Sequence, residues 1–461
     1  MATGAYAQTA DAIIDKLVDK GILTVREANE LREEADKNFN TAYAVKSGMS
    51  DWVTSLKING DMRGRFEGFY ADDPAFIDRT RFRYRLRLGV VATLMDNFEV
   101  GLRLTSSEAN GSFGGDPISG NTTMTDNGSK KFVYIDLAYG RWTAVNNSFW
   151  SAVTTVGKME NPFVFSDLVF DGDYTPEGLA QQFVFNLHEK HALKVNLGGF
   201  VLDEIGGQSE DSYLMGAQIR FDSIWTPKIS TSVGLAGLNI TENEALASNT
   251  PVAATRVPVT DSTGAVVDFD PATAGVQTNF VSIANSAGAT VPDVNTGNDR
   301  VGVNLAHNYN PIVADAAITY NLDHFPRYAG VFPIRLAADY MWNPAVEDEN
   351  IGYSIGIAFG KSGKRGTWDL AYRWKELQGD AWYEELVDSD FGAFYRTAPA
   401  GGGSGYRAGT NIRGHVIKAS YSPYDSLTFG VTYFMTEVIE ESPAASDSDM
   451  NRLQVDAVWK F

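Results

Sequence analysis

A strict alternation of charged and apolar residues constrains this chain more than any other feature. In residues 81–88 every odd position is arginine and every even position is Phe, Tyr or Leu. Because successive side chains of a β-strand point to opposite faces, such a strand has one charged and one apolar face. The two faces must therefore meet two different solvents, as in the wall of a membrane β-barrel.

The same period of two recurs from residue 56 to the end of the chain. We predict an all-β, transmembrane antiparallel barrel of about sixteen strands, because a closed bacterial barrel has an even strand number. The predicted strands are 56–66, 81–88, 98–104, 133–139, 150–156, 179–187, 193–201, 213–221, 229–235, 312–322, 334–342, 351–359, 368–374, 415–421, 427–435 and 453–461.

The connections between these strands alternate between short turns and long polar stretches. Residues 95–97 and 146–148 are short, whereas 106–130, 239–299 and 378–411 are long. Short turns at one rim and long loops at the other are typical of outer-membrane barrels. A soluble β-sandwich or propeller is the alternative, but it predicts polar outer faces, and residues 351–359 carry no charge on either face.

Composition excludes several other classes of protein. No apolar run of the 461 residues approaches the roughly 18 to 20 that a membrane helix needs, and the mean hydropathy is −0.20. Cysteine is absent, which removes disulfides and thiolate chemistry. The formal net charge of −20 argues against a nucleic-acid partner.

The N-terminal segment follows a different period. Ile13, Leu17 and Val18 recur at helical spacing, and Thr24 with Glu27 has the form of a capping box. We predict a short helical hairpin within residues 9–40. The chain then divides into an N-terminal periplasmic extension, 1–50, and a barrel domain, 51–461.

The last strand carries the most specific local signal. Leu453, Val455, Ala457 and Trp459 alternate with more polar residues, and the strand ends on Phe461. This resembles the terminal strand by which outer-membrane barrels are recognised for assembly, with Phe461 as the assembly signal.

Two further segments carry a resemblance to a family. Residues 157–163 (GKMENPF) and 171–178 (DGDYTPEG) resemble the strand and constriction loop of outer-membrane porins of the general and phosphate type. The resemblance implies a sixteen-stranded homotrimer in the bacterial outer membrane, in contact with lipid and lipopolysaccharide, with this loop folded into the lumen. The N-terminal extension resembles those through which some barrels engage peptidoglycan or a periplasmic partner.

The chemistry of the pore follows from charges expected to point inward. Opposed charges across a narrow lumen would create a transverse field that lets small ions of both signs pass. The basic wall is predicted to be Arg63, Arg65, Arg81, Arg83, Arg85, Arg87 and Arg103, and the constriction loop to carry Asp167, Asp171, Asp173 and Glu177. Alternatively, the arginines only pair with neighbours such as Asp61, Glu67 and Glu99 to tie strands together.

These features predict a porin for passive diffusion of small hydrophilic solutes and ions. Two alternatives are a structural tether between the outer membrane and peptidoglycan, and a barrel-borne hydrolase using His307 or His324. We predict no catalytic residue, metal site or cofactor, because no nucleophile elbow, P-loop or dinucleotide fingerprint occurs in a fitting context.

Overall fold

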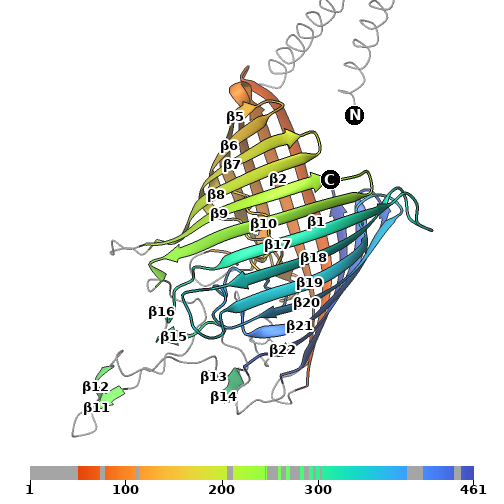
Figure 1. Cartoon of the computed structure of the whole chain (residues 1–461). Helices are drawn as coiled ribbons and strands as arrows, with labels where there is room; N and C mark the ends of the chain where they lie inside the picture. Colours follow the sequence, from red (N-terminus) through yellow and green to blue (C-terminus); the bar gives the residue numbers. More distant parts are fainter. Residues whose placement is uncertain are drawn as a thin grey trace, which may run out of the picture. The chain divides into compact units, whose positions relative to one another are not determined.

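The structure is a computed structural model of the whole chain (Figure 1). It describes residues 50–72, 78–108, 114–204, 211–243, 246, 258–260, 266–269, 281–284, 290–293, 297–301, 304–391, 409–440 and 448–461. The helical hairpin predicted within residues 9–40 lies outside the described residues, as does most of the predicted 239–299 loop.

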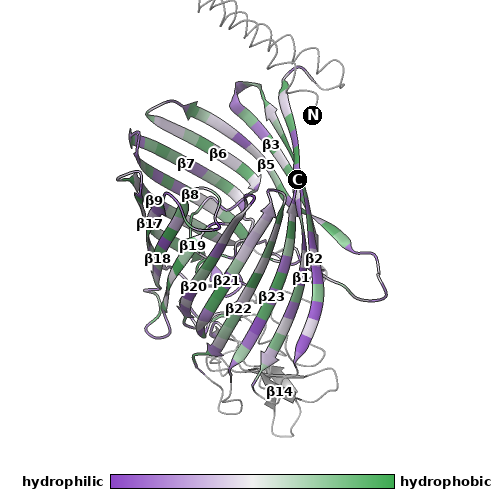
Figure 2. Cartoon of the chain, turned by 90° about the vertical axis from the view of Figure 1, so that its right-hand side faces the viewer, coloured by the Kyte–Doolittle hydropathy of each residue, from purple (hydrophilic) through white to green (hydrophobic). Residues whose placement is uncertain are grey.

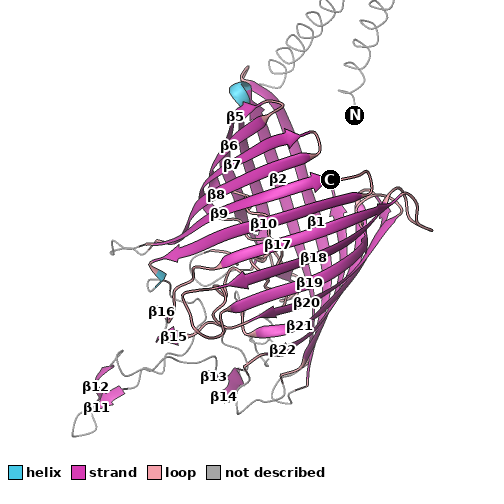
Figure 3. Cartoon of the chain, in the orientation of Figure 1, coloured by secondary structure: helices cyan, strands magenta, loops and turns pink. Residues whose placement is uncertain are grey.

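One antiparallel sheet holds sixteen long strands and a short strand, β4, of two residues. Each predicted strand lies within, or within one residue of, one of the sixteen, so the predicted strand number is confirmed (Figures 1 and 3). The long strands are β1 (Val53–Ala71), β2 (Arg79–Leu94), β3 (Phe98–Ser107), β5 (Phe132–Asn146), β6 (Trp150–Lys158), β7 (Glu177–His188), β8 (His191–Asp203), β9 (Ser212–Ile224), β10 (Ile229–Thr241), β17 (Ile312–Leu322), β18 (Phe332–Trp342), β19 (Ile351–Gly360), β20 (Thr367–Leu377), β21 (Ile412–Tyr424), β22 (Leu427–Val438) and β23 (Met450–Lys460).

The remaining described elements are small. Strand β4 (Thr122–Thr123) pairs with β2, and η1 (Met95–Asn97) is a 3₁₀ turn between β2 and β3. No helix within the described residues has the length and hydropathy needed to cross a membrane. Three two-stranded pairs lie between β10 and β17: β11 (Pro258–Thr260) with β12 (Val266–Phe269), β13 (Val281–Ala284) with β14 (Thr290–Asp293), and β15 (Arg300–Val301) with β16 (Asn304–Leu305).

The sheet closes because its first and last strands pair. In β1 and β23, Asp61 lies opposite Lys460 and Ala71 opposite Met450. The C-terminal residue extends this pairing: Phe461 N donates to Gly60 O at 3.1 Å, and Gly60 N donates to Phe461 O at 3.0 Å. Closure leaves no sheet edge with unpaired N–H and C=O groups, which hydrocarbon would penalise.

Hydrophilic and hydrophobic residues alternate along the strands (Figure 2), and the exposed fractions of their side chains alternate on β2 as predicted. On β2, Phe82 is 59% exposed and Leu86 is 44% exposed, whereas Arg83 and Arg85 are each 6% exposed. In a one-layer closed sheet, the exposed apolar side chains form the outer face and the buried polar ones the inner face.

Long and short connections alternate along the chain. Residues 225–228 and 425–426 are short turns, while 108–131, 159–176 and 378–411 are long. Because neighbouring strands are antiparallel, the long connections share one rim, which in this class of barrel is the extracellular one.

The chain forms two compact units. The first comprises Met1–Lys57 with Val91–Val100, and the second comprises Ile58–Val90 with Gly101–Phe461. In the described part of the first unit, Thr54 Oγ1 donates to Thr93 O at 3.0 Å. The arginines and carboxylates of the candidate site belong to the second unit.

Candidate functional site

Two arginines of β2 hold two carboxylates between them. Arg85 donates to Asp173 Oδ2 at 2.6 Å and to Asp61 Oδ1 at 3.0 Å. Arg87 donates to Asp61 Oδ2 at 2.7 Å and to Asp173 Oδ1 at 3.2 Å. Asp61 comes from the neighbouring strand β1, while Asp173 comes from the 159–176 connection. This charge-balanced group of four, here called the ion quartet, therefore joins that connection to the inner face of β2.

A second network surrounds Glu67, whose side chain is completely buried. Its Oε2 accepts from Arg81 Nε at 2.5 Å, and its Oε1 accepts from Arg452 Nη2 at 2.7 Å. Arg65 and Arg83 lie further away, at 3.5 and 3.8 Å from the same carboxylate. One carboxylate cannot balance four guanidinium groups, so the network needs acidic groups from elsewhere.

A long connection on the same rim supplies one of these groups. Asp390, in the 378–411 connection, accepts from Arg65 at 3.1 Å and from Arg452 at 2.8 Å. Asp456 on β23 adds a two-pronged pair with Arg65, at 2.7 and 2.8 Å. Asp390 and Arg452 were not among the predicted pore residues, although Asp388-Ser389-Asp390 repeats the Asp-x-Asp pattern of residues 171–173.

Two arginines of the predicted basic wall, Arg63 and Arg103, belong neither to the ion quartet nor to the network around Glu67. Arg63 Nη2 donates to the neutral amide oxygen of Asn121 at 2.6 Å, and the described residues give Arg63 no ion pair. Arg103 pairs with Asp136 on β5 and with Glu160 in the 159–176 connection. Asp61 and Glu67 do pair with arginines of β2, as the alternative of strand-to-strand pairing predicts.

The predicted acidic residues divide among several partners. Besides Asp173, Asp167 pairs with Arg373 and lies 3.5 Å from Lys375 Nζ. Glu177, the first residue of β7, pairs with Lys158 at 3.0 Å. Only Asp173 of the four contacts the arginines of β2 within the described interactions.

Asp171 is held by main-chain groups instead of cations. Its Oδ1 accepts from Asp173 N at 2.8 Å, and its Oδ2 accepts from Ser389 N at 2.9 Å. Burial, together with the carboxylates of Asp388 and Asp173, raises the pKa of Asp171 well above its usual value. Burial opposes ionisation of Asp173 too, but Arg85, Arg63 and Arg87 outweigh it and lower the pKa of Asp173.

Apolar side chains fix both connections to the barrel wall. From the 159–176 connection, Phe163, Leu168, Val169 and Phe170 join one buried cluster. The cluster also contains Leu214, Leu238, Ile240, Val313 and Met341 from strands, and Ala381, Trp382, Leu386 and Val387 from the 378–411 connection.

The two connections are also bonded to each other. Asp171 N donates to Leu386 O at 2.8 Å, and the Phe170 and Trp382 rings meet edge to face with centroids 6.1 Å apart. The strand residues of the cluster face away from the exposed apolar side: on β9, Leu214 is buried and the next residue, Met215, is 46% exposed. The two connections and the inner wall therefore form one packed assembly.

Comparisons with known proteins complete the description of the site. Among solved structures, the fold is similar to Pseudomonas putida OprB at high pH, with 11% identity, a TM-score of 0.46, and coverage of 88% of this chain and 94% of that chain. It is also similar to Salmonella typhi OmpF in complex with daunomycin, with 11% identity, a TM-score of 0.45, and coverage of 88% and 97%. No curated protein sequence matches the chain. The model of the family described as "Putative porin" matches residues 73–461.

Proposed function

The chain belongs to this porin family and resides in the bacterial outer membrane, and we propose that it is a passive diffusion channel for small hydrophilic solutes and ions. A barrel of sixteen strands is too wide for its own inward side chains to fill, so water occupies the lumen. The charged inner face of β2 suits such a solvent.

The width of the channel is set, in this proposal, by the 159–176 connection folded into the lumen. The ion quartet carries the proposal, because Asp173 can reach Arg85 and Arg87 only from inside the barrel. The shared apolar cluster makes residues 378–391 a second part of the same constriction.

The charged side chains that line this constriction would govern the ion selectivity of the channel. Arg85 and Arg87 pair directly with Asp61 and Asp173, so the ion quartet presents alternating charges to the lumen while its local charge stays balanced. Arg63, which donates to a neutral amide, adds positive charge beside them. We expect a pore that passes ions of both signs with a modest preference for anions.

The assembly and partners of the channel belong to the same proposal. The exposed apolar side chains of the outer face would contact lipid, and lipopolysaccharide would meet the long-connection rim. We expect a homotrimer. A peptidoglycan or periplasmic partner would bind through residues 1–50, which lie outside the described residues apart from residue 50.

Reversal potentials under a salt gradient test the constriction directly. Asp173→Asn removes one negative charge from the ion quartet, so chloride permeability relative to potassium should rise about twofold or more. Glu177→Gln is the matched control, because Glu177 is 64% exposed and pairs with Lys158 instead. Equal shifts in the two variants would contradict the assignment of Asp173 to the narrow part of the pore.

A further inference from the structure

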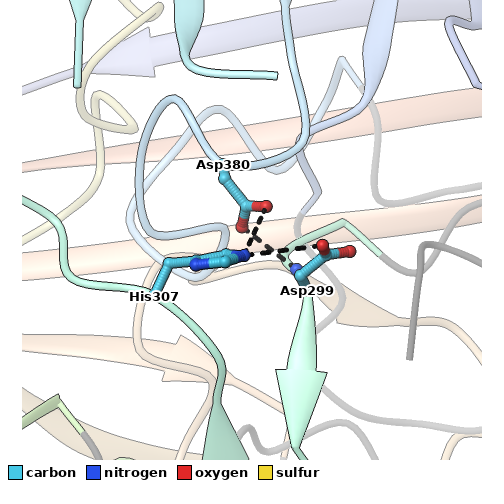
Figure 4. Close-up of side chains that lie close together, drawn as sticks. All are labelled: Asp299, His307 and Asp380. Carbon is cyan, nitrogen blue, oxygen red and sulfur yellow. Dashed lines mark hydrogen bonds and ion pairs between the residues drawn. The ribbon is translucent and has the colours of Figure 1, made fainter. Parts of the chain in front are cut away.

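Three side chains with metal-binding chemistry, none of them a member of the ion quartet, meet in the connections of the long-connection rim (Figure 4). Asp299 and His307 come from the β10–β17 connection, and Asp380 comes from the β20–β21 connection. One ligand atom of each residue lies within 4.8 Å of the other two. The segments are far apart in the sequence, which is why no metal-ligand spacing was visible there.

The distances between these side chains are too long for direct hydrogen bonds and lie at or just above those between ligands of one cation. His307 Nε2 lies 3.6 Å from Asp299 Oδ2 and 3.8 Å from Asp380 Oδ2. An N–H···O hydrogen bond is usually 2.7–3.2 Å long. Ligands bound tetrahedrally at about 2.0–2.2 Å from zinc are separated from one another by about 3.3–3.6 Å.

The buried member of the group is held in place by its second oxygen. Asp380 Oδ1 accepts from Tyr309 Oη at 2.8 Å and from Asp299 N at 3.0 Å. Its Oδ2 accepts no hydrogen bond from the described residues and points toward His307 (Figure 4). Ligating carboxylates are commonly oriented in this way by an outer hydrogen bond.

The main chain around the group is equally constrained. Asp380 N donates to Glu349 O at 2.8 Å. Asn298, completely buried beside Asp299, donates to the carbonyl oxygens of Gly379 and Trp382, both at 2.7 Å. Three connections of one rim therefore converge on a group whose geometry is fixed before any ion binds.

The charge balance of the three side chains also favours a bound cation. Elsewhere in the described residues, the buried carboxylate of Glu67 is paired with arginine. Asp299 and Asp380 have His307 as their only described cationic partner. His307 is 30% exposed, so an ion has access from solvent.

We propose that Asp299, His307 and Asp380 bind a divalent transition-metal cation, which clamps the β10–β17 connection to the β20–β21 connection at the extracellular rim. One imidazole and two carboxylates suit Zn²⁺ better than Ca²⁺ or Mg²⁺, which prefer oxygen ligands alone. Water would complete the coordination, since the described residues offer three ligands.

Zinc binding to the full-length protein in detergent, without a histidine tag, tests this proposal. His188 and His191, whose rings lie 5.7 Å apart at the opposite rim, offer a competing site. The starting protein should therefore carry His188→Gln and His191→Gln. Isothermal titration should give one Zn²⁺ per chain in this background, with Ca²⁺ and Mg²⁺ binding much more weakly.

Variants of the group then separate a built site from surface binding. His307→Gln should abolish the stoichiometric site, and Tyr309→Phe should weaken it about tenfold by releasing Asp380. Zinc should also slow hydrogen exchange in residues 297–307 and 378–386 of the background protein, but not in His307→Gln. Unchanged zinc affinity in His307→Gln, or no saturable binding in the background, would overturn the proposal. Heat-modifiable electrophoretic mobility checks that each variant is folded.

Discussion

The pKa values of Asp171 and Asp173, two residues apart, are shifted in opposite directions. Asp173 faces three arginines, which lower its pKa, whereas burial and the neighbouring carboxylates of Asp388 and Asp173 raise the pKa of Asp171. Asp171 therefore gains its proton first as the pH falls, while Asp173 stays ionised. Lowering the pH should therefore remove the negative charge of Asp171 before it disrupts the ion quartet.

The preference of the channel for chloride over potassium should change as Asp171 gains its proton. Between pH 8 and pH 5, protonation of Asp171 removes negative charge, so preference for chloride over potassium should increase. Asp171→Asn should be more anion-selective at pH 8 and change less with pH, although Asp388, whose pKa is also raised, should leave some slope. Reversal potentials at both pH values measure this effect. A wild-type preference that moves toward cations on acidification would contradict it.

The sequence identifies charged residues at this scale but not their partners. The odd-numbered arginines of β2 follow from the alternation alone, because a period of two places them on one face. That Asp173 meets Arg85 while Asp167 meets Arg373 depends on how a long connection folds, and no local pattern determines that. Asp390 was missed for the same reason, because its role depends on residues 65 and 452.

At the scale of elements, the seam between β1 and β23 depends on a glycine. A Cβ on Gly60 would lie 2.3 Å from Arg87 O and 2.6 Å from the Phe461 ring, whereas one on Gly64 would meet nothing within 4 Å. The carbonyl oxygen cannot move without disturbing the β1–β2 pairing. Gly60 therefore permits the close approach of β2 on one side and of the Phe461 ring, at the closing seam, on the other.

We expect an added methyl group at Gly60 to hinder folding of the barrel, and one at Gly64 to have little effect. Gly60→Ala should lower the yield of heat-resistant folded barrel after refolding in detergent, while Gly64→Ala on the same strand should refold like wild type. Gel mobility without boiling measures the folded fraction. Equal yields for the two variants would show that the seam adapts to the extra methyl group.

The packing of the two connections on the wall gives a second prediction for elements. Leu168 is completely buried and Val164, in the same connection, is 50% exposed. Leu168→Ala should lower the local opening free energy by about 2–5 kcal/mol, while Val164→Ala should change it little. Hydrogen exchange at the Asp171 amide, which donates to Leu386 O, reports this opening. Equal exchange rates in the two variants would show that the cluster does not hold the connection.

The strands follow from sequence better than the connections do. All sixteen were predicted because each has two faces in different solvents, which imposes a period of two. Several observed strands extend beyond their predicted ends. Strand β1, for example, continues to Ala71, whereas the predicted strand ends at residue 66. The assembly of the 159–176 and 378–391 segments was not predicted, since its contacts join residues more than 200 positions apart.

At the scale of the whole molecule, one wall separates two environments, and in the proposed function one set of connections narrows the space inside. The outer face carries exposed apolar side chains, the inner face carries paired charges, and the long-connection rim carries the proposed metal clamp. The central claim is that water and small ions still pass between the ion quartet and the opposite wall.

Single-channel recording in planar lipid bilayers tests this claim most directly. Purified full-length protein should produce stepwise, ohmic conductance increases, in groups of three if the homotrimer forms. Correctly folded protein, verified by its heat-modifiable mobility, that inserts without any conductance step would contradict the account. It would show that the two packed connections close the lumen rather than narrow it.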